Sequence, residues 1–266
     1  MGGWRLDPLP LLAAAAVLVL YGHGFARVRR RRRELAPRSR AAAFAAGVLV
    51  AVLALVSPLD RLGEEKLLSA HMLQHLLLGD VAPLLLVLGM RGPLAVFVLP
   101  QQQLRVLARL RPLRSFVSFL LRPKVSFAVW ALATGAWHVP AAYDGAIAHP
   151  ALHVAEHASF AIVGLLVWAQ IVDPTGHRRG SPGRRALFAG TVLVTGMGLS
   201  EALLLSAPLY PHYAHVADRP LGFTAAEDQR RAALLMMAEQ IATLATAAAL
   251  LLWSHAERVA REFSAA

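Results

Sequence analysis

Cysteine is absent from this chain of 266 residues. Its absence excludes disulfide bonds, thiolate metal sites and a cysteine nucleophile. A metal ion would have to be bound by histidine, methionine, carboxylate or backbone oxygen. The sequence also lacks a nucleophile–base motif and the histidine spacing of zinc proteases, so it does not predict an enzyme.

Charged residues are scarce as well. They make up 16% of the chain against 57% hydrophobic residues, whereas a soluble domain has about 25% charged and about 45–50% apolar residues. The mean hydropathy is +0.52. The charges are clustered between apolar stretches, so loops of a membrane protein explain the net charge of +11 better than nucleic-acid binding does, and no nucleic-acid motif is present.

Seven apolar segments approach the roughly 20 residues that a membrane-spanning helix needs. The predicted spans are residues 8–26, 41–57, 67–90, 124–139, 150–172, 186–207 and 232–254. We therefore expect an all-α, polytopic transmembrane bundle of about seven spans, forming a single integral-membrane domain over residues 1–266. Segment 101–121 alternates leucine with arginine, which predicts either an amphipathic helix on the bilayer surface or a solvated basic loop.

The basic residues predict how the bundle is oriented. Most of the 27 lysines and arginines fall in the connections at 26–40, 91–124 and 173–185 and in the C-terminal tail. Loops rich in lysine and arginine stay in the cytoplasm. The N-terminus is thus expected outside and the C-terminus in the cytoplasm, which agrees with an odd number of spans.

Two pairs of histidines lie near the predicted outer ends of spans. His71 and His75 are four residues apart, as are His153 and His157. Residues at this spacing share a helix face, and imidazole is a common ligand of copper, zinc, iron and nickel. A lone histidine at a span end is more often an interfacial residue, so the metal-site hypothesis depends on the paired spacing.

Carboxyl groups are expected at a similar depth. Glu201 and Glu239 lie about as far from the outer boundary as His75 and His157, roughly 9–12 Å at 1.5 Å per residue. Ionisable side chains inside a membrane are costly and are read by default as functional. The alternative is that both glutamates only form hydrogen bonds with neighbouring helices.

Two other acidic residues receive different interpretations. Glu156 precedes His157 and is expected to orient an imidazole on an adjacent helix. Asp80 follows His71 by nine residues, which places the two side chains on opposite faces of an α-helix. We therefore expect Asp80 to be a separate group, used for helix packing or for proton binding.

Several short motifs occur together in a recognisable order. They are His71-Met72-Leu73-Gln74-His75-Leu76 followed by Ala82-Pro83, Trp137-His138-Val139-Pro140, His153-Val154-Ala155-Glu156-His157, Pro208-Leu209-Tyr210-Pro211, and Glu227-Asp228-Gln229. In these motifs, over residues 40–250, the chain resembles the CtaG-type cytochrome c oxidase assembly factors, which are seven-span bacterial membrane proteins. The sequence departs from that family at Gly79-Asp80 and over 235–240.

The resemblance implies a function and a set of ligands. It implies maturation of a haem–copper cytochrome c oxidase by copper binding or delivery, in a bacterial inner membrane and in contact with oxidase subunits. The implied copper ligands are His71, His75, His153 and His157, with His138 and Met72 as additional candidates. Glu201 and Glu239 would tune the site or accept protons that the ligands release.

Two other functions remain open from the residues alone. Paired histidines also bind haem as axial ligands. A proton-coupled or metal-coupled transporter could use Asp80, Glu201 and Glu239, although the sequence shows no internal repeat of the kind that transporters carry.

Overall fold

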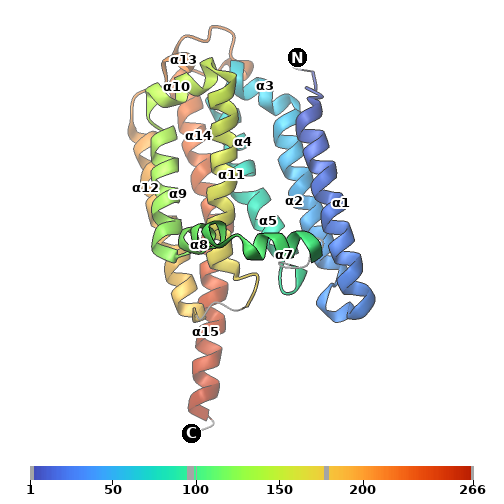
Figure 1. Ribbon diagram of the computed structural model, residues 1–266. Coiled ribbons are helices and arrows are strands. Elements are labelled where there is room, and N and C mark those ends of the chain that lie inside the picture. Colours follow the sequence, from blue (N-terminus) through green and yellow to red (C-terminus); the bar gives the residue numbers. More distant parts are fainter. Residues whose placement is uncertain (1–2, 95–98, 100, 177–179, 265–266) are drawn as a thin grey trace.

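The computed structural model describes residues 3–94, 99, 101–176 and 180–264. These residues form helices, with no strand among them. The long helices run side by side in a bundle, and the two termini lie at opposite ends of it (Figure 1). This arrangement confirms the predicted all-α polytopic fold.

Most of the bundle consists of continuous long helices. They are α1 (Pro8–Arg31), α2 (Arg38–Val56), α9 (Pro123–Trp137), α11 (Pro150–Val172) and α12 (Pro182–Leu205). Two more long helices each contain a π-helical turn. The first is α4 (Leu68–Leu76), η2 (Leu77–Val81) and α5 (Ala82–Gly89), and the second is α14 (Ala225–Gln240), η4 (Ile241–Ala245) and α15 (Thr246–Ser264).

Shorter helices lie near the ends of the bundle. One end, called here the α10 end, carries α3 (Pro58–Glu65), α10 (Pro140–Ala148) and α13 (Pro211–Ala214), while α7 (Gln101–Arg109) and α8 (Arg111–Leu120) lie across the bundle toward the other end (Figure 1). The expected amphipathic segment 101–121 is therefore helical rather than a loop. None of the α8 side chains is buried.

The predicted spans agree with the helices except at their ends. Within the described part of the chain, six helices are long and apolar enough to cross a membrane, and a seventh span results if α8 and α9 are taken together across their 76° bend. The predicted span 124–139 corresponds to α9, which has 15 residues and packs against α11. The last span begins earlier than expected, because Thr224 and Glu227 form a capping box that starts α14 at Ala225.

Proline starts several of these helices. Helices α9, α10, α11 and α12 each have proline at the first turn, at Pro123, Pro140, Pro150 and Pro182. Proline has no N–H, and the first N–H groups of a helix have no partner within the helix, so proline costs little there. For α11 this start places His153 and His157 within the first two turns.

Two close approaches hold α4 and η2 against their neighbours. A Cβ atom on Gly164 of α11 would overlap the main-chain oxygen of Gly79, so only glycine allows these backbones to meet. A Cβ on Gly63 of α3 would lie 2.9 Å from the Cα of His71. The glycines therefore bring α3 and α11 onto the two sides of the helix that carries His71 and His75.

The start of α4 is capped from another helix. Asp228 of α14 is 1% exposed and accepts hydrogen bonds from the main-chain N–H groups of Leu68, at 2.7 Å, and Ser69, at 3.1 Å. A carboxylate at a helix N-terminus satisfies free N–H groups and interacts favourably with the helix dipole. The cap fixes the height of α4 relative to α14.

Candidate metal centre

Four histidines converge near the α10 end of the bundle. His71 and His75 of α4 face His153 and His157 of α11. Their ring centroids are 4.3 Å apart for His71–His75, 5.3 Å for His71–His153, 5.3 Å for His75–His157 and 4.2 Å for His153–His157. All four are buried, with exposed fractions from 0% to 9%. The two helical pairs predicted from spacing therefore form one cluster.

The hydrogen of the His71 ring can be placed from its neighbours. Nδ1 of His71 lies 2.8 Å from the hydroxyl oxygen of Tyr213, and that hydroxyl donates to the main-chain oxygen of Gly63 at 2.6 Å. Burial raises the pKa of Tyr213 well above its ordinary value, so the hydroxyl keeps its single hydrogen. Because this hydrogen is used on Gly63, Nδ1 of His71 must be the donor, which leaves Nε2 with a free lone pair.

The hydrogen of the His153 ring follows in the same way. Nδ1 of His153 lies 3.0 Å from Oε1 of Glu64 in α3. The hydrogen bond from His153, together with Arg5 at 2.8 Å, holds the pKa of Glu64 below its ordinary value. An ionised carboxylate only accepts hydrogen bonds, so Nδ1 of His153 carries a hydrogen, and in the neutral ring that binds a metal the lone pair is on Nε2.

The two lone-pair nitrogens point at each other. Nε2 of His71 and Nε2 of His153 are 3.4 Å apart. When both rings are neutral in these tautomers, neither Nε2 carries a hydrogen, so no hydrogen bond joins them. In a tetrahedral site with metal–nitrogen bonds of about 2.0–2.1 Å, two ligand nitrogens lie about 3.3 Å apart. The observed separation therefore suits two nitrogens that share one metal ion.

The rest of the cluster offers further ligand atoms. His71, His75 and His157 can bring one ring nitrogen each within 4.8 Å of the others, and so can His71, His153 and a carboxylate oxygen of Glu156. Both ring nitrogens of His75, Nε2 of His157 and both carboxylate oxygens of Glu156 are buried without a hydrogen-bond partner. Glu156 is 3.8 Å from Nε2 of His75, so it contacts the facing helix as expected.

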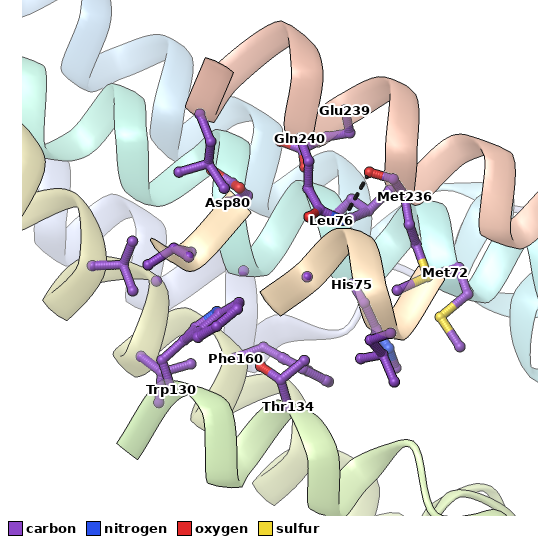
Figure 2. A pocket seen from close by; sticks show the side chains of 18 of the residues that line it. Met72, His75, Leu76, Asp80, Trp130, Thr134, Phe160, Met236, Glu239 and Gln240 are labelled. Atoms are coloured by element: carbon purple, nitrogen blue, oxygen red, sulfur yellow. Dashed lines mark hydrogen bonds between the residues drawn. The ribbon is translucent and has the colours of Figure 1, made fainter. Parts of the chain in front are cut away.

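A pocket of about 80 Å³ lies deeper in the bundle beside the cluster (Figure 2). Four of the other predicted site residues line this pocket together with His75. They are Met72, Asp80, His138 and Glu239. Nδ1 of His138 lies 2.8 Å from the main-chain oxygen of Thr134, so that nitrogen donates and Nε2 is buried without a partner. Met72 packs in an apolar cluster with Tyr143 and Met236.

Two expectations about carboxyl groups need correction. Asp80 does not lie apart from the histidine face, because it lines the same pocket as His75. The expectation assumed an α-helix, whereas Asp80 lies in the π-helical turn η2, whose i→i+5 hydrogen bonds change the register. Glu201 does not join the other carboxyls, since it is exposed on α12 and does not line the pocket.

Three residues that orient the site were not predicted. Glu64 and Tyr213 fix the hydrogens of His153 and His71, and Asp228 caps the helix that carries His71. The Asp228 motif was noticed only as a helix boundary. Glu64 and Tyr213 lie in short helices at the α10 end, where polar residues are common, so no local signal distinguished them.

The chain matches a known family over most of its length. A model of the family described as cytochrome c oxidase caa3 assembly factor (Caa3_CtaG) matches residues 19–258, and the chain belongs to that family. A search of curated proteins and a search of solved structures found no match. The family membership agrees with the resemblance found in the sequence motifs.

Proposed function

We propose that this caa3 oxidase assembly factor binds a copper ion at the histidine cluster and passes it to a cytochrome c oxidase subunit. The observation that supports the proposal best is the 3.4 Å approach of Nε2 of His71 to Nε2 of His153. Each ring is held by a hydrogen bond at its other nitrogen, to Tyr213 and to Glu64. Partners of this kind fix the ring orientation and the tautomer of metal-binding histidines.

The ligand types suit a transferable copper ion. Neutral imidazole binds both Cu(I) and Cu(II), and thioether sulfur adds preference for Cu(I). His71, His75, His153 and His157 are the proposed ligands, with His138 and Met72 of the neighbouring pocket as additional ones. A site that lacks thiolates holds copper less tightly than a cysteine site does, which suits release to a partner.

The charge distribution supports an orientation for transfer. The arginines at the C-terminal end of α1, at the start of α12 and in the last part of α15 lie at the end opposite the histidine cluster, and loops rich in arginine stay in the cytoplasm. We infer that the α10 end faces the non-cytoplasmic side of a bacterial inner membrane. A copper ion at the cluster would then lie close to the surface from which an oxidase subunit could accept it.

Haem is a weaker candidate for this site. The pocket beside the cluster measures about 80 Å³, whereas pockets for organic ligands measure roughly 300–1,000 Å³. The four rings are also in mutual contact, with centroids as close as 4.2 Å. This packing favours a single ion over a macrocycle.

The test is to measure copper bound by the detergent-purified protein, by elemental analysis together with an absorption spectrum. We expect stoichiometric copper in the wild type and none in a His71→Ala/His157→Ala variant. His215 is an exposed histidine outside the cluster, so His215→Ala serves as the control and should bind like the wild type. Thermal unfolding without copper checks that each variant is folded.

The outcomes separate the competing hypotheses. Failure of the folded wild type to bind copper under both reducing and oxidising conditions would refute the proposed ligands. Equal copper binding by the double variant would refute the location. A haem spectrum in the purified protein would support the alternative.

A further inference from the structure

Two carboxyl groups line the inner part of the same pocket. Asp80 comes from η2 and Glu239 from α14, and Figure 2 shows both at the pocket with Gln240 and Trp130. The titratable side chains that line the pocket among the described residues are His75, Asp80, His138 and Glu239. No lysine or arginine is among these lining residues, so no permanently charged cation of the pocket lining neutralises the carboxyls.

The backbone of both helices departs from α-helix at this level. Asp80 lies within the π-helical turn Leu77–Val81, and Glu239 is two residues before the π-helical turn Ile241–Ala245. Such turns are rare and often occur at functional sites. Two of them on facing helices, each beside a half-buried carboxyl group, indicate that the irregularity serves this site.

The neighbouring side chains offer few hydrogen-bond donors to the carboxyl groups of Asp80 and Glu239. The indole N–H of Trp168 donates to Oδ1 of Asp80. Thr243 interacts with both carboxyl groups, but its hydroxyl donates to the main-chain oxygen of Glu239 at 3.0 Å. A hydroxyl has one hydrogen, so Thr243 can serve only one of these three acceptors at a time.

Several oxygen atoms at this site have no donor. Asp80 and Glu239 are close enough to interact, yet neither carboxylate oxygen of Glu239 has a hydrogen-bond partner of good geometry. Oε1 of Gln240, a side chain only 6% exposed, has none either. A buried acceptor without a donor is costly. The site therefore needs hydrogen from a ligand or from water.

We propose that Asp80 and Glu239 form an intramembrane proton-binding site, in which the two carboxyl groups share one proton. Two adjacent carboxylates in a low-dielectric site cannot both stay ionised without a cation, and a shared proton resolves the repulsion. Their protons then titrate as a pair rather than as separate residues. The proton also supplies the donor that the unpartnered oxygens lack.

The pocket offers this proton a route of exchange. Its volume of about 80 Å³ exceeds the roughly 10–15 Å³ that one water molecule needs, so the pocket has room for water. His75 and the carboxyl pair line the same volume. The proton site is thus next to the histidine cluster, although it does not depend on copper being bound there.

Infrared spectroscopy of the full-length, metal-free protein tests the proposal directly. A protonated carboxyl group has a C=O stretch that is separate from the amide and carboxylate bands and shifts in deuterated water. We expect such a band at neutral pH in the wild type, a changed band in Asp80→Asn and in Glu239→Gln, and in the double variant loss of the part of the band that this pair contributes. Any remaining band would come from Glu156, whose buried carboxyl oxygens also lack a hydrogen-bond partner. Both substitutions keep the size of the side chain, and the amide oxygen that Asp80→Asn introduces would still accept from Trp168.

Glu65→Gln is the control, because Glu65 is an exposed carboxylate outside the candidate spans, paired with Arg61 at 2.8 Å, and should leave the band unchanged. Absence of a protonated carboxyl band from the wild type at neutral pH would overturn the proposal, as expected if a metal cation neutralised the pair instead. A band that persists unchanged in the double variant would overturn it as well. Because the protein is free of metal, these outcomes do not depend on the copper-binding proposal.

Discussion

Replacing Tyr213 by phenylalanine tests how the site orients His71. The substitution removes a hydroxyl that accepts from Nδ1 of His71 and donates to Gly63 at 2.6 Å. His71 is completely buried, so no solvent replaces the lost acceptor. Its ring is then free to move the hydrogen to Nε2, the nitrogen that faces His153, where it would block the metal.

The expected size of the effect follows from these contacts. Loss of an oriented partner of a metal-binding histidine weakens metal affinity about 10–100-fold, which is about 1.4–2.7 kcal/mol. The same change leaves a buried N–H and a buried carbonyl without partners and lowers the free energy of unfolding by about 1–3 kcal/mol. A competition titration with a copper chelator and thermal unfolding without metal measure the two effects separately.

Tyr21 provides a matched control. Its hydroxyl donates to the main-chain oxygen of Gly89 at 3.0 Å, in a buried position far from the cluster. Tyr21→Phe should lower stability to a similar degree and leave copper affinity unchanged. If Tyr213→Phe bound copper as tightly as Tyr21→Phe does, the assignment of the His71 hydrogen would be wrong.

Three further variants test other contacts by thermal unfolding in detergent. Glu64→Gln should destabilise the metal-free protein at neutral pH. The difference in stability from the wild type should shrink as the pH falls below the ordinary glutamate pKa of 4.5, because a carboxyl group with a lowered pKa loses its stabilising effect only as it becomes protonated. A difference in stability that does not depend on pH would contradict this. Gly164→Ala should cost about 1–3 kcal/mol through overlap with Gly79, while Gly198→Ala, which meets open space, should be neutral or stabilising. Asp228→Ala should cost about 1–2 kcal/mol by removing the cap of α4; no loss would show that the cap is dispensable.

Local patterns predicted the parts of the site that belong to one helix. The i, i+4 spacing of His71 with His75, and of His153 with His157, places each pair on one face whatever the rest of the fold does. The same reasoning failed for Asp80, because it assumed the α-helical period through a π-helical turn. It also failed for Glu201, because depth along a helix does not specify the direction in which a side chain points.

The long-range partners could not be predicted in this way. His153 meets Glu64, and His71 meets Tyr213 across 142 residues of sequence. Each partner lies in a short helix at the α10 end whose position depends on how the long helices pack. A glutamate or tyrosine in such a segment looks like any other polar surface residue until that packing is known.

The sequence by itself determined that the chain is a multi-span helical membrane protein and which histidines share a helix face. Those properties depend on composition and on helical periodicity, which are local. Only the tertiary structure decided that the two histidine faces meet, that Nε2 of His71 lies 3.4 Å from Nε2 of His153, and that Asp80 and Glu239 line one pocket. These features depend on close backbone approaches, such as Gly79 against Gly164, and on hydrogen bonds between distant segments, which no local pattern encodes.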